Sequence, residues 1–193
     1  TVYKWHDTLS LYRMYTDNSA YHWGSVLPIS NMSISNYNLI YYELDSANYQ
    51  SYKKRASSVI HFFHGVNPHN IVYISNMYSF GGDNCANEIY HAWFSDKTEW
   101  DNAKNSNGPP PGFLVGGPNR EFKWDDCCPD KCGNEYNNSQ CKALDISSAI
   151  NQPPMKCYLD FNTGWPLNSW AVSEPAIYYQ AAYLRMIVPF VKR

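Results

Sequence analysis

Apolar residues recur at helical spacing near the two ends of the chain. Residues 47–64 place an apolar stripe on one helical face and basic residues on the other, which predicts an amphipathic helix. Gly65 follows as a left-handed C-cap. Similar spacing from Tyr3 to Tyr15 and from Ser35 to Leu44 predicts two further helices. We therefore interpret residues 1–65 as helical.

The pattern changes in residues 66–172, where Gly, Pro, Asn and Ser dominate and only Glu88–Phe94 predicts a short helix. Irregular chain of this length is uncommon inside a compact domain unless it carries function. We therefore expect a loop-rich active-site region here. A final helix is predicted over residues 173–191, where Ser173 is a suitable N-cap and apolar residues again follow one face.

The composition excludes several classes of protein. Of 193 residues, 17% are charged and the formal net charge is −2, so the chain lacks the basic stripe that nucleic-acid binding needs. No apolar run approaches the roughly 20 residues of a membrane span. A hydrophobic content of 44% argues against disorder. The abundance of Tyr, Trp and Asn suits a surface that meets neutral, hydroxylated ligands.

The six cysteines predict disulfides and a secreted, extracellular protein. Their number is even and four fall within residues 125–141, as in proteins of oxidising compartments. Sequons for N-glycosylation at Asn31 and Asn137 agree with secretion. Adjacent cysteines do not readily bond to each other, so we expect Cys127 and Cys128 to reach different partners. The cysteines are Cys85, Cys127, Cys128, Cys132, Cys141 and Cys157.

Metal binding is an alternative use of some of these residues. Cys128, Cys132 and Cys141 could supply thiolates to zinc. Against zinc, the chain has no Cys-x2-Cys pair, and His91 is the only histidine that follows Cys85. Structural Ca2+, which prefers oxygen ligands, is a second expectation. The two candidate calcium sets are Asp125, Asp126 and Asp130, and Asp83, Asn84 and Glu88.

Glu174 is the residue in the final predicted helix with the clearest chemical potential. It lies in the stretch from Trp170 to Ala176 that opens this helix. One interpretation is that Glu174 only complements the helix dipole. A general acid instead needs a raised pKa, which requires burial or a neighbouring carboxylate. Trp165 and Trp170 could form an apolar wall beside it.

Five short segments are each only weakly specific for a protein family. Together, in the order in which they occur along the chain, they are specific. They are Trp23-Gly24-Ser25; Gly65-Val66-Asn67-Pro68 with Tyr73 and Gly81; His91; Gly112 to Asn119; and Trp170-x3-Glu174-x-Ala176-x3-Gln180-Ala181. From about Trp23 onward the chain resembles the C-terminal part of glycoside hydrolase family nine, inverting cellulases with an (α/α)6 barrel, although Gln180 replaces the usual Asn. The resemblance implies an all-α fold, in which residues 1–193 form the C-terminal portion of one (α/α)6 barrel with long disulfide-stapled loops.

The resemblance also implies roles for individual residues. Glu174 would be the general acid that protonates the glycosidic oxygen of the departing sugar. His91 would hydrogen-bond the sugar near the point of cleavage. Trp93, Trp165 and Trp170 are candidates for stacking on sugar rings. The implied activity is that of a secreted endo-β-1,4-glucanase acting on cellulose-like polysaccharide or oligosaccharide.

The chain departs from the family pattern in two further places. Trp93 stands where the family has Arg, which suggests stacking in place of that contact. Trp165 stands nine residues before Glu174, where an acidic residue is usual. Asp160 or Asn168 could take over that position after an insertion.

The catalytic base of the family is absent from the sequence. Members carry an Asp-x-x-Asp pair near their N-terminus, and no such motif occurs in residues 1–193. Inverting hydrolysis needs an acid and a base roughly 6.5–9.5 Å apart, with a water molecule between them. We therefore expect the chain to be inactive alone and to combine with the N-terminal portion of the same catalytic domain, as a separate chain or fragment.

Two hypotheses from other classes remain open. A carbohydrate-binding module that does not cleave would suit the cysteines and the seven Trp residues. Such a module is usually a β-sandwich, whereas the apolar periodicity here is helical. An unrelated all-α interaction domain would leave Glu174 as a capping residue. Loss of hydrolysis on replacing Glu174 would separate the glycosidase hypothesis from both.

Overall fold

The regular structure of the chain is mainly helical. The computed structural model describes residues 11–14, 16–90, 97–100 and 107–191. Its α-helices are α1 (Val26–Tyr41), α2 (Tyr49–Phe63), α3 (Glu135–Ala143), α4 (Trp170–Ser173) and α5 (Ile177–Ile187). Its strands are β1 (Val72–Ser75) and β2 (Cys85–Ala86), which pair in parallel. Short 3₁₀ turns lie at Asn18–Ala20, Ser46–Asn48, Tyr78–Phe80, Pro154–Lys156 and Val188–Phe190. None of the described helices is long and apolar enough to cross a membrane.

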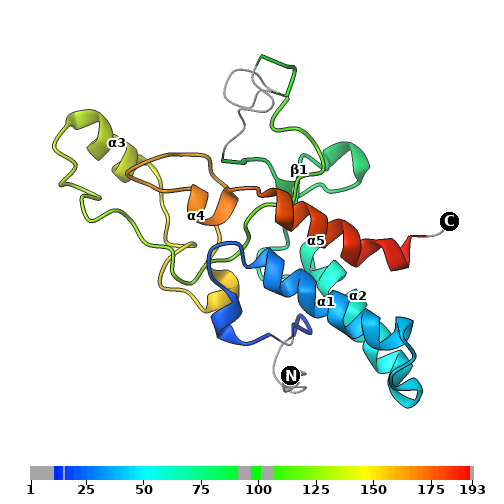
Figure 1. Cartoon of the computed structure of the whole chain (residues 1–193). Helices are drawn as coiled ribbons and strands as arrows, with labels where there is room; N and C mark the ends of the chain where they lie inside the picture. The colour runs from blue at the N-terminus through cyan, green and yellow to red at the C-terminus, as the bar shows by residue number, and fades with distance from the viewer. Residues whose placement is uncertain (1–10, 15, 91–96, 101–106, 192–193) are drawn as a thin grey trace.

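Helices α1, α2 and α5 pack against one another and form the helical core (Figure 1). On α2, Ala56, Val59 and Phe63 are fully buried, whereas Lys53 and Lys54 are exposed. This is the stripe that the sequence pattern predicts. Each large apolar side chain buried in this way contributes about 1.5–3 kcal/mol, so mutual packing stabilises the three helices.

A buried asparagine connects the end of α2 to β1. The Nδ2 group of Asn67 donates to the carbonyls of Phe62 and Ile71, at 2.7 Å each. Its Oδ1 accepts from the backbone N–H groups of His69 and Ile71, at 3.1 and 3.3 Å. The Gly-Val-Asn-Pro segment therefore turns the chain from the helices into the loop-rich region, and Gly65 has the predicted left-handed backbone (φ +110°).

Two predicted helix boundaries are wrong. The helix predicted over Ser35–Leu44 begins at Val26, and the final helix begins at Ile177 instead of residue 173. The second error arises at Pro175, because a proline disfavours helical backbone in the residue before it. Glu174 is accordingly extended, with φ −70° and ψ 122°.

The other predicted helices fall largely outside the described residues. Of the segment Tyr3–Tyr15, residues 11–14 are described and form no helix. Of Glu88–Phe94, the described residues 88–90 are not helical. The sequence pattern did not predict α3, which lies inside the region expected to be irregular.

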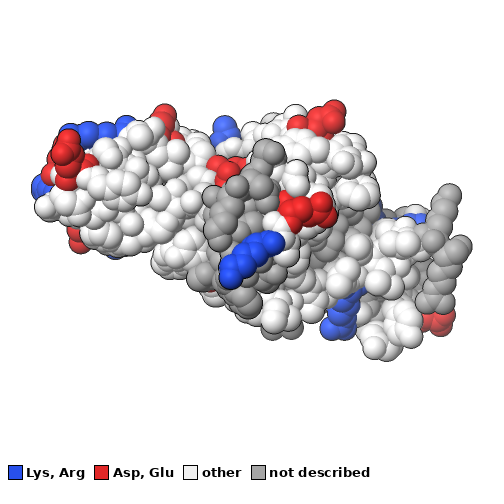
Figure 2. Space-filling view, turned by 90° about the horizontal axis from the view of Figure 1, so that it is seen from above, with Lys and Arg blue, Asp and Glu red and all other residues white. Residues whose placement is uncertain are grey.

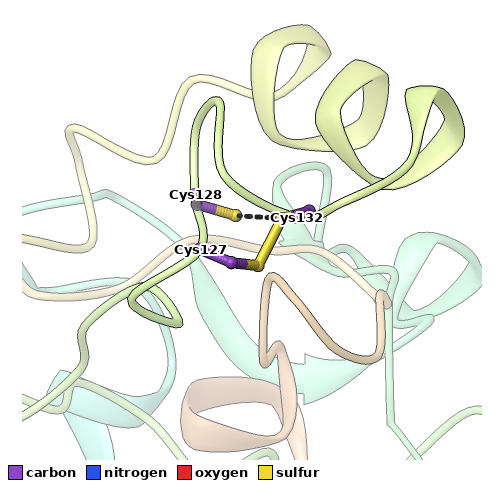
Figure 3. A group of neighbouring side chains, drawn as sticks. All are labelled: Cys127, Cys128 and Cys132. Atoms are coloured by element: carbon purple, nitrogen blue, oxygen red, sulfur yellow. Dashed lines mark hydrogen bonds between the residues drawn. A yellow bond between two sulfur atoms is a disulfide. The ribbon is translucent and has the colours of Figure 1, made fainter.

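Two disulfides staple the segment that carries α3, residues 125–143, which we call the α3 lobe. The bonds join Cys127 to Cys132 and Cys128 to Cys141. The adjacent cysteines thus reach different partners, as predicted. Figure 3 shows the bond from Cys127 to Cys132. Figure 2 shows acidic and basic side chains gathered at the end of the molecule that carries this lobe.

The remaining two cysteines, Cys85 and Cys157, are free and buried, so the prediction that all six form disulfides is wrong. The Cys85 sulfur accepts a hydrogen bond from the Met77 N–H at 3.1 Å. The Cys157 thiol donates to the Gln152 carbonyl at 3.3 Å, and burial raises its pKa. Both residues pack as small, inert core side chains.

Candidate functional site

The candidate site is built around residues 170–176, which we call the acid strap. In this segment α4 ends at Ser173 and α5 begins at Ile177, with the extended Glu174 between them. The Glu174 side chain is half-buried. Because Glu174 lies before the N-cap of α5, which is Ala176, the interpretation that it complements a helix dipole in a first turn is wrong.

Trp23 holds the carboxyl group of Glu174 from a position 151 residues away in the sequence. Its indole Nε1 donates to Glu174 Oε2 at 2.9 Å. The indole ring makes edge-to-face contacts with Tyr178 and Tyr179, with centroids 6.5 and 6.1 Å apart. The sequence analysis missed this partnership, although Trp23 opens the Trp-Gly-Ser segment of the family pattern.

The Gly-Gly-Pro-Asn segment holds the backbone of the acid strap. The N–H of Gly117 donates to the Val172 carbonyl at 3.0 Å, and Asn119 Nδ2 donates to the Ala171 carbonyl at 2.9 Å. At Gly116 an added Cβ would lie 3.0 Å from the Val172 oxygen, so the two backbones approach closely. The small residues of the segment make this close approach possible.

Two further contacts join distant segments to the strap and to α5. The N–H of Tyr90 donates to the Ser173 carbonyl at 3.2 Å, which brings the residue before His91 beside the strap. The amide of Gln180 accepts from the Leu114 N–H and donates to the Leu114 carbonyl, at 2.8 Å each. Gln180 therefore makes a reciprocal amide contact at the position where the family has Asn.

A pocket of about 280 Å³ lies next to the Trp23 side chain. The residues that line it are His22, Trp23, Gly24, Leu27, Glu121, Tyr178 and Tyr179. Burial raises the pKa of the Tyr179 phenol far above its ordinary value, so this group stays neutral. The pocket thus presents aromatic rings beside the hydrogen bond to Glu174.

The other predicted sugar-binding residues are not all tested by the structure. Trp165 and Trp170 are 56% and 40% exposed, so their rings are accessible, and neither lines this pocket of the described chain. His91 and Trp93 lie outside the described residues. Their roles stay predictions.

A half-buried carboxylate, Asp160, contacts the backbone segment that leads toward His91. Its oxygens accept from the N–H groups of Asn87 and Glu88, at 2.8 and 3.3 Å, and from the Tyr158 hydroxyl at 3.3 Å. Burial raises the pKa of Asp160, and this effect outweighs that of the hydrogen bonds, which lower it. Of the two residues that could replace the family's acidic position, Asp160 is thus the one whose carboxyl group is half-buried and held by hydrogen bonds.

Asn168, the other alternative, serves a turn. Its backbone has φ +58°, its N–H donates to the Gly164 carbonyl at 3.3 Å, and its own carbonyl accepts from Ala171 at 3.0 Å. These are backbone contacts that position the start of α4.

The structure gives different results for the predicted zinc and calcium ligands. In the described part of the chain, the one group of three or more His, Cys, Asp or Glu side chains close enough to share an ion is Cys127, Cys128 and Cys132. Their sulfur atoms lie within 4.8 Å of one another (Figure 3). Disulfide formation removes the thiolates that zinc would need. Asp125, Asp126 and Asp130 form no such group among the described residues, and Asp130 instead pairs with Lys142 at 2.8 Å. The set of Asp83, Asn84 and Glu88 stays a prediction.

Comparison with known proteins identifies a family whose model matches the chain. The model of glycosyl hydrolase family 9 matches residues 3–187. None of the curated proteins matches the chain. Among solved structures, AaCel9A in complex with a cellobiose-like isofagomine is similar, with a TM-score of 0.61 and 19% identity. That match covers 93% of this chain and 27% of the other.

Two other solved structures are similar over most of this chain. A single mutant of a thermostable endoglucanase from Alicyclobacillus acidocaldarius has a TM-score of 0.61 and 17% identity, covering 94% of this chain and 27% of that one. A family 9 glycoside hydrolase of Bacteroides ovatus has a TM-score of 0.54 and 20% identity, covering 88% and 22%. These likenesses show a shared fold. The chain spans about a quarter of the length of these relatives.

Proposed function

Because this chain belongs to glycosyl hydrolase family 9, we propose that it is part of a secreted hydrolase that cleaves β-1,4-glucan with inversion, and that Glu174 supplies the general acid. The observation that carries this proposal is that several distant segments contact the same short stretch of chain. Trp23, the Gly116–Asn119 segment and Tyr90, all distant in sequence, make their contacts on the acid strap that carries Glu174. A carboxyl group that only capped a helix would not need such support.

The proposed chemistry uses Glu174 as a proton donor. Glu174 protonates the glycosidic oxygen while the bond from this oxygen to the anomeric carbon breaks. The exposed rings of Trp165 and Trp170 offer apolar platforms for pyranose faces. His91 and Trp93 add contacts near the scissile bond. A water molecule attacks from the opposite face of the sugar, activated by a carboxylate base.

We assign that base to the remainder of the catalytic domain. The sequence has no Asp-x-x-Asp pair, and the chain spans about a quarter of its solved relatives. Helix α5 and the 3₁₀ turn after it also expose apolar side chains: Ile177 and Leu184 of α5 are 88% and 57% exposed, and Val188 of the turn is 60% exposed. Apolar patches of this kind mark surfaces that another body covers. In the proposal, that body is the rest of an (α/α)6 barrel.

The test is the variant Glu174→Gln in the complete catalytic domain. Hydrolysis of a soluble β-1,4-glucan should fall about 10²–10⁴-fold, the usual contribution of a general acid. Proton NMR of the unmodified enzyme's first product should detect the α-anomer, as inversion requires. Glu135→Gln, an exposed carboxyl-to-amide change on α3, is the matched control and should keep its activity. Undiminished hydrolysis by Glu174→Gln would remove Glu174 as the acid.

A further inference from the structure

The hydrogen bond from Trp23 to Glu174 has a consequence for where the catalytic proton resides. An indole N–H is a donor and has no acceptor. Since Trp23 Nε1 lies 2.9 Å from Oε2 of Glu174, this oxygen accepts a hydrogen bond from the indole. In the protonated carboxyl group the arrangement favours the proton on the other oxygen, Oε1.

We propose that Trp23 is a positioning residue for the general acid, which directs the transferable proton of Glu174 to Oε1. This proposal rests on the proposed function. When Oε1 gives its proton to the glycosidic oxygen, the electron pair of the breaking C–O bond stays with the departing sugar, and a carboxylate remains on Glu174. The indole N–H then donates to a charged oxygen, and such hydrogen bonds are roughly twice as strong as neutral ones. The contact therefore strengthens as the reaction proceeds, which is the requirement for catalysis.

The surroundings of Trp23 fix its ring before substrate binds. Tyr178 and Tyr179 contact the indole edge-to-face, and the two phenol rings contact each other with centroids 4.6 Å apart. The Trp23 carbonyl accepts from His22 Nδ1 at 2.7 Å, which holds its backbone. A donor that is already in place spends no reorganisation energy during the reaction.

The variant Trp23→Phe tests the proposal in the complete catalytic domain, because it keeps an aromatic ring and removes the N–H. Two substrates are compared. Cleavage of cellotetraose releases a sugar, a poor leaving group that must be protonated as it departs. Cleavage of 2,4-dinitrophenyl β-cellobioside releases dinitrophenolate, which departs without a proton. We expect kcat on cellotetraose to fall about tenfold to a hundredfold, from the usual strength of hydrogen bonds to charged groups. On the dinitrophenyl substrate kcat should stay within about threefold.

The ratio of the two rates decides the outcome, because both rates fall together if part of the sample is unfolded. A ratio unchanged from the unmodified enzyme would overturn the proposal and leave Trp23 as a packing or sugar-stacking residue. Trp124→Phe, at a half-buried indole packed against the core, is the matched control and should leave the ratio unchanged. Glu174→Gln serves as reference. If Glu174→Gln keeps its activity on cellotetraose, the proposed function fails. If Glu174→Gln is inactive but Trp23→Phe leaves the ratio unchanged, only the role of Trp23 is refuted.

Discussion

The acid strap and the α3 lobe both lie outside the helical core, and they are fixed by different interactions. The strap, residues 170–176, is held by hydrogen bonds from segments up to 151 residues away. The α3 lobe, residues 125–143, is held by two disulfides that close separations of 5 and 13 residues. Its helix begins with a local cap, in which Asn134 accepts from the Asn137 N–H at 2.7 Å.

The difference teaches which region can carry precise chemistry. Long-range contacts place the strap relative to several elements at once, so a change in any of these elements moves Glu174. Local cross-links preserve the shape of the lobe and make little demand on the rest of the molecule. We therefore expect changes around the strap to reduce both stability and hydrolysis, and changes in the lobe to reduce local stability alone.

The largest expected effect comes from Gly24→Ala, beside Trp23. Gly24 has φ +72°, and an added Cβ would lie 2.8 Å from ring carbons of the buried Tyr179. Gly133 in the α3 lobe is the matched control, with φ +76° and no atom within 4 Å of the added Cβ. Both substitutions carry the left-handed backbone cost of about 1–2 kcal/mol, and Gly24→Ala adds about 1–3 kcal/mol of overpacking.

Thermal melting and β-glucan hydrolysis of the two glycine variants measure this difference in the complete catalytic domain. Gly24→Ala should melt lower than Gly133→Ala and should also lose activity, because the Trp23 turn moves. Equal melting temperatures and equal activities would mean that the Trp23 turn adapts freely, which contradicts the distinction between strap and lobe.

The opposite change, loosening the lobe, has a smaller expected effect. Replacing Cys128 and Cys141 together by Ser removes the disulfide with the longer separation. The chain-entropy account gives a loss of about 2–3 kcal/mol for such a loop. Hydrogen exchange should accelerate in α3 while activity stays within about twofold. A large loss of hydrolysis would show that the lobe takes part in the site.

The sequence analysis succeeded where the signal was local and apolar. α2 was predicted correctly because its apolar stripe follows the helical period and becomes its buried face. α3 was missed because its nine residues are mostly polar, and its order depends on the Asn134 cap and the disulfides. The start of the last helix was misplaced because an N-cap signal at Ser173 competes with the effect of Pro175 on the residue before it.

The site was predictable only in part for a related reason. Glu174 could be named from the order of the family segments, and Gly116 and Asn119 belong to those segments. The hydrogen bond from Trp23 joins residues 151 positions apart, and no periodicity encodes such a contact. Asp160 was left open because it lies 14 residues before Glu174 instead of nine, and spacing cannot locate a displaced residue.

The smallest expected effect is a difference in pH dependence between two aspartates, one near each region. Burial raises the pKa of Asp160 above its ordinary 3.8, so the native state binds its proton more tightly than the unfolded chain. Its contribution to stability is therefore present below about pH 4 and is lost as pH rises through the native pKa. Asp145, just after α3, has a pKa lowered by the Ser147 N–H. Its contribution is present above pH 4 and is lost as pH falls.

Asp160→Asn and Asp145→Asn should therefore respond to pH with opposite signs. Relative to the unmodified domain, Asp160→Asn should gain stability as pH rises from 4 to 7, because the amide does not ionise in this half-buried site. Asp145→Asn should lose relative stability as pH rises toward 4 from more acidic conditions and should change little between pH 4 and 7, because an amide accepts the Ser147 hydrogen bond more weakly than a carboxylate does. Melting curves of the three proteins at several pH values measure both slopes. An Asp160→Asn slope equal to that of the unmodified domain would show that burial does not raise the pKa of Asp160, and the group would then ionise in the native state as it does in the unfolded chain.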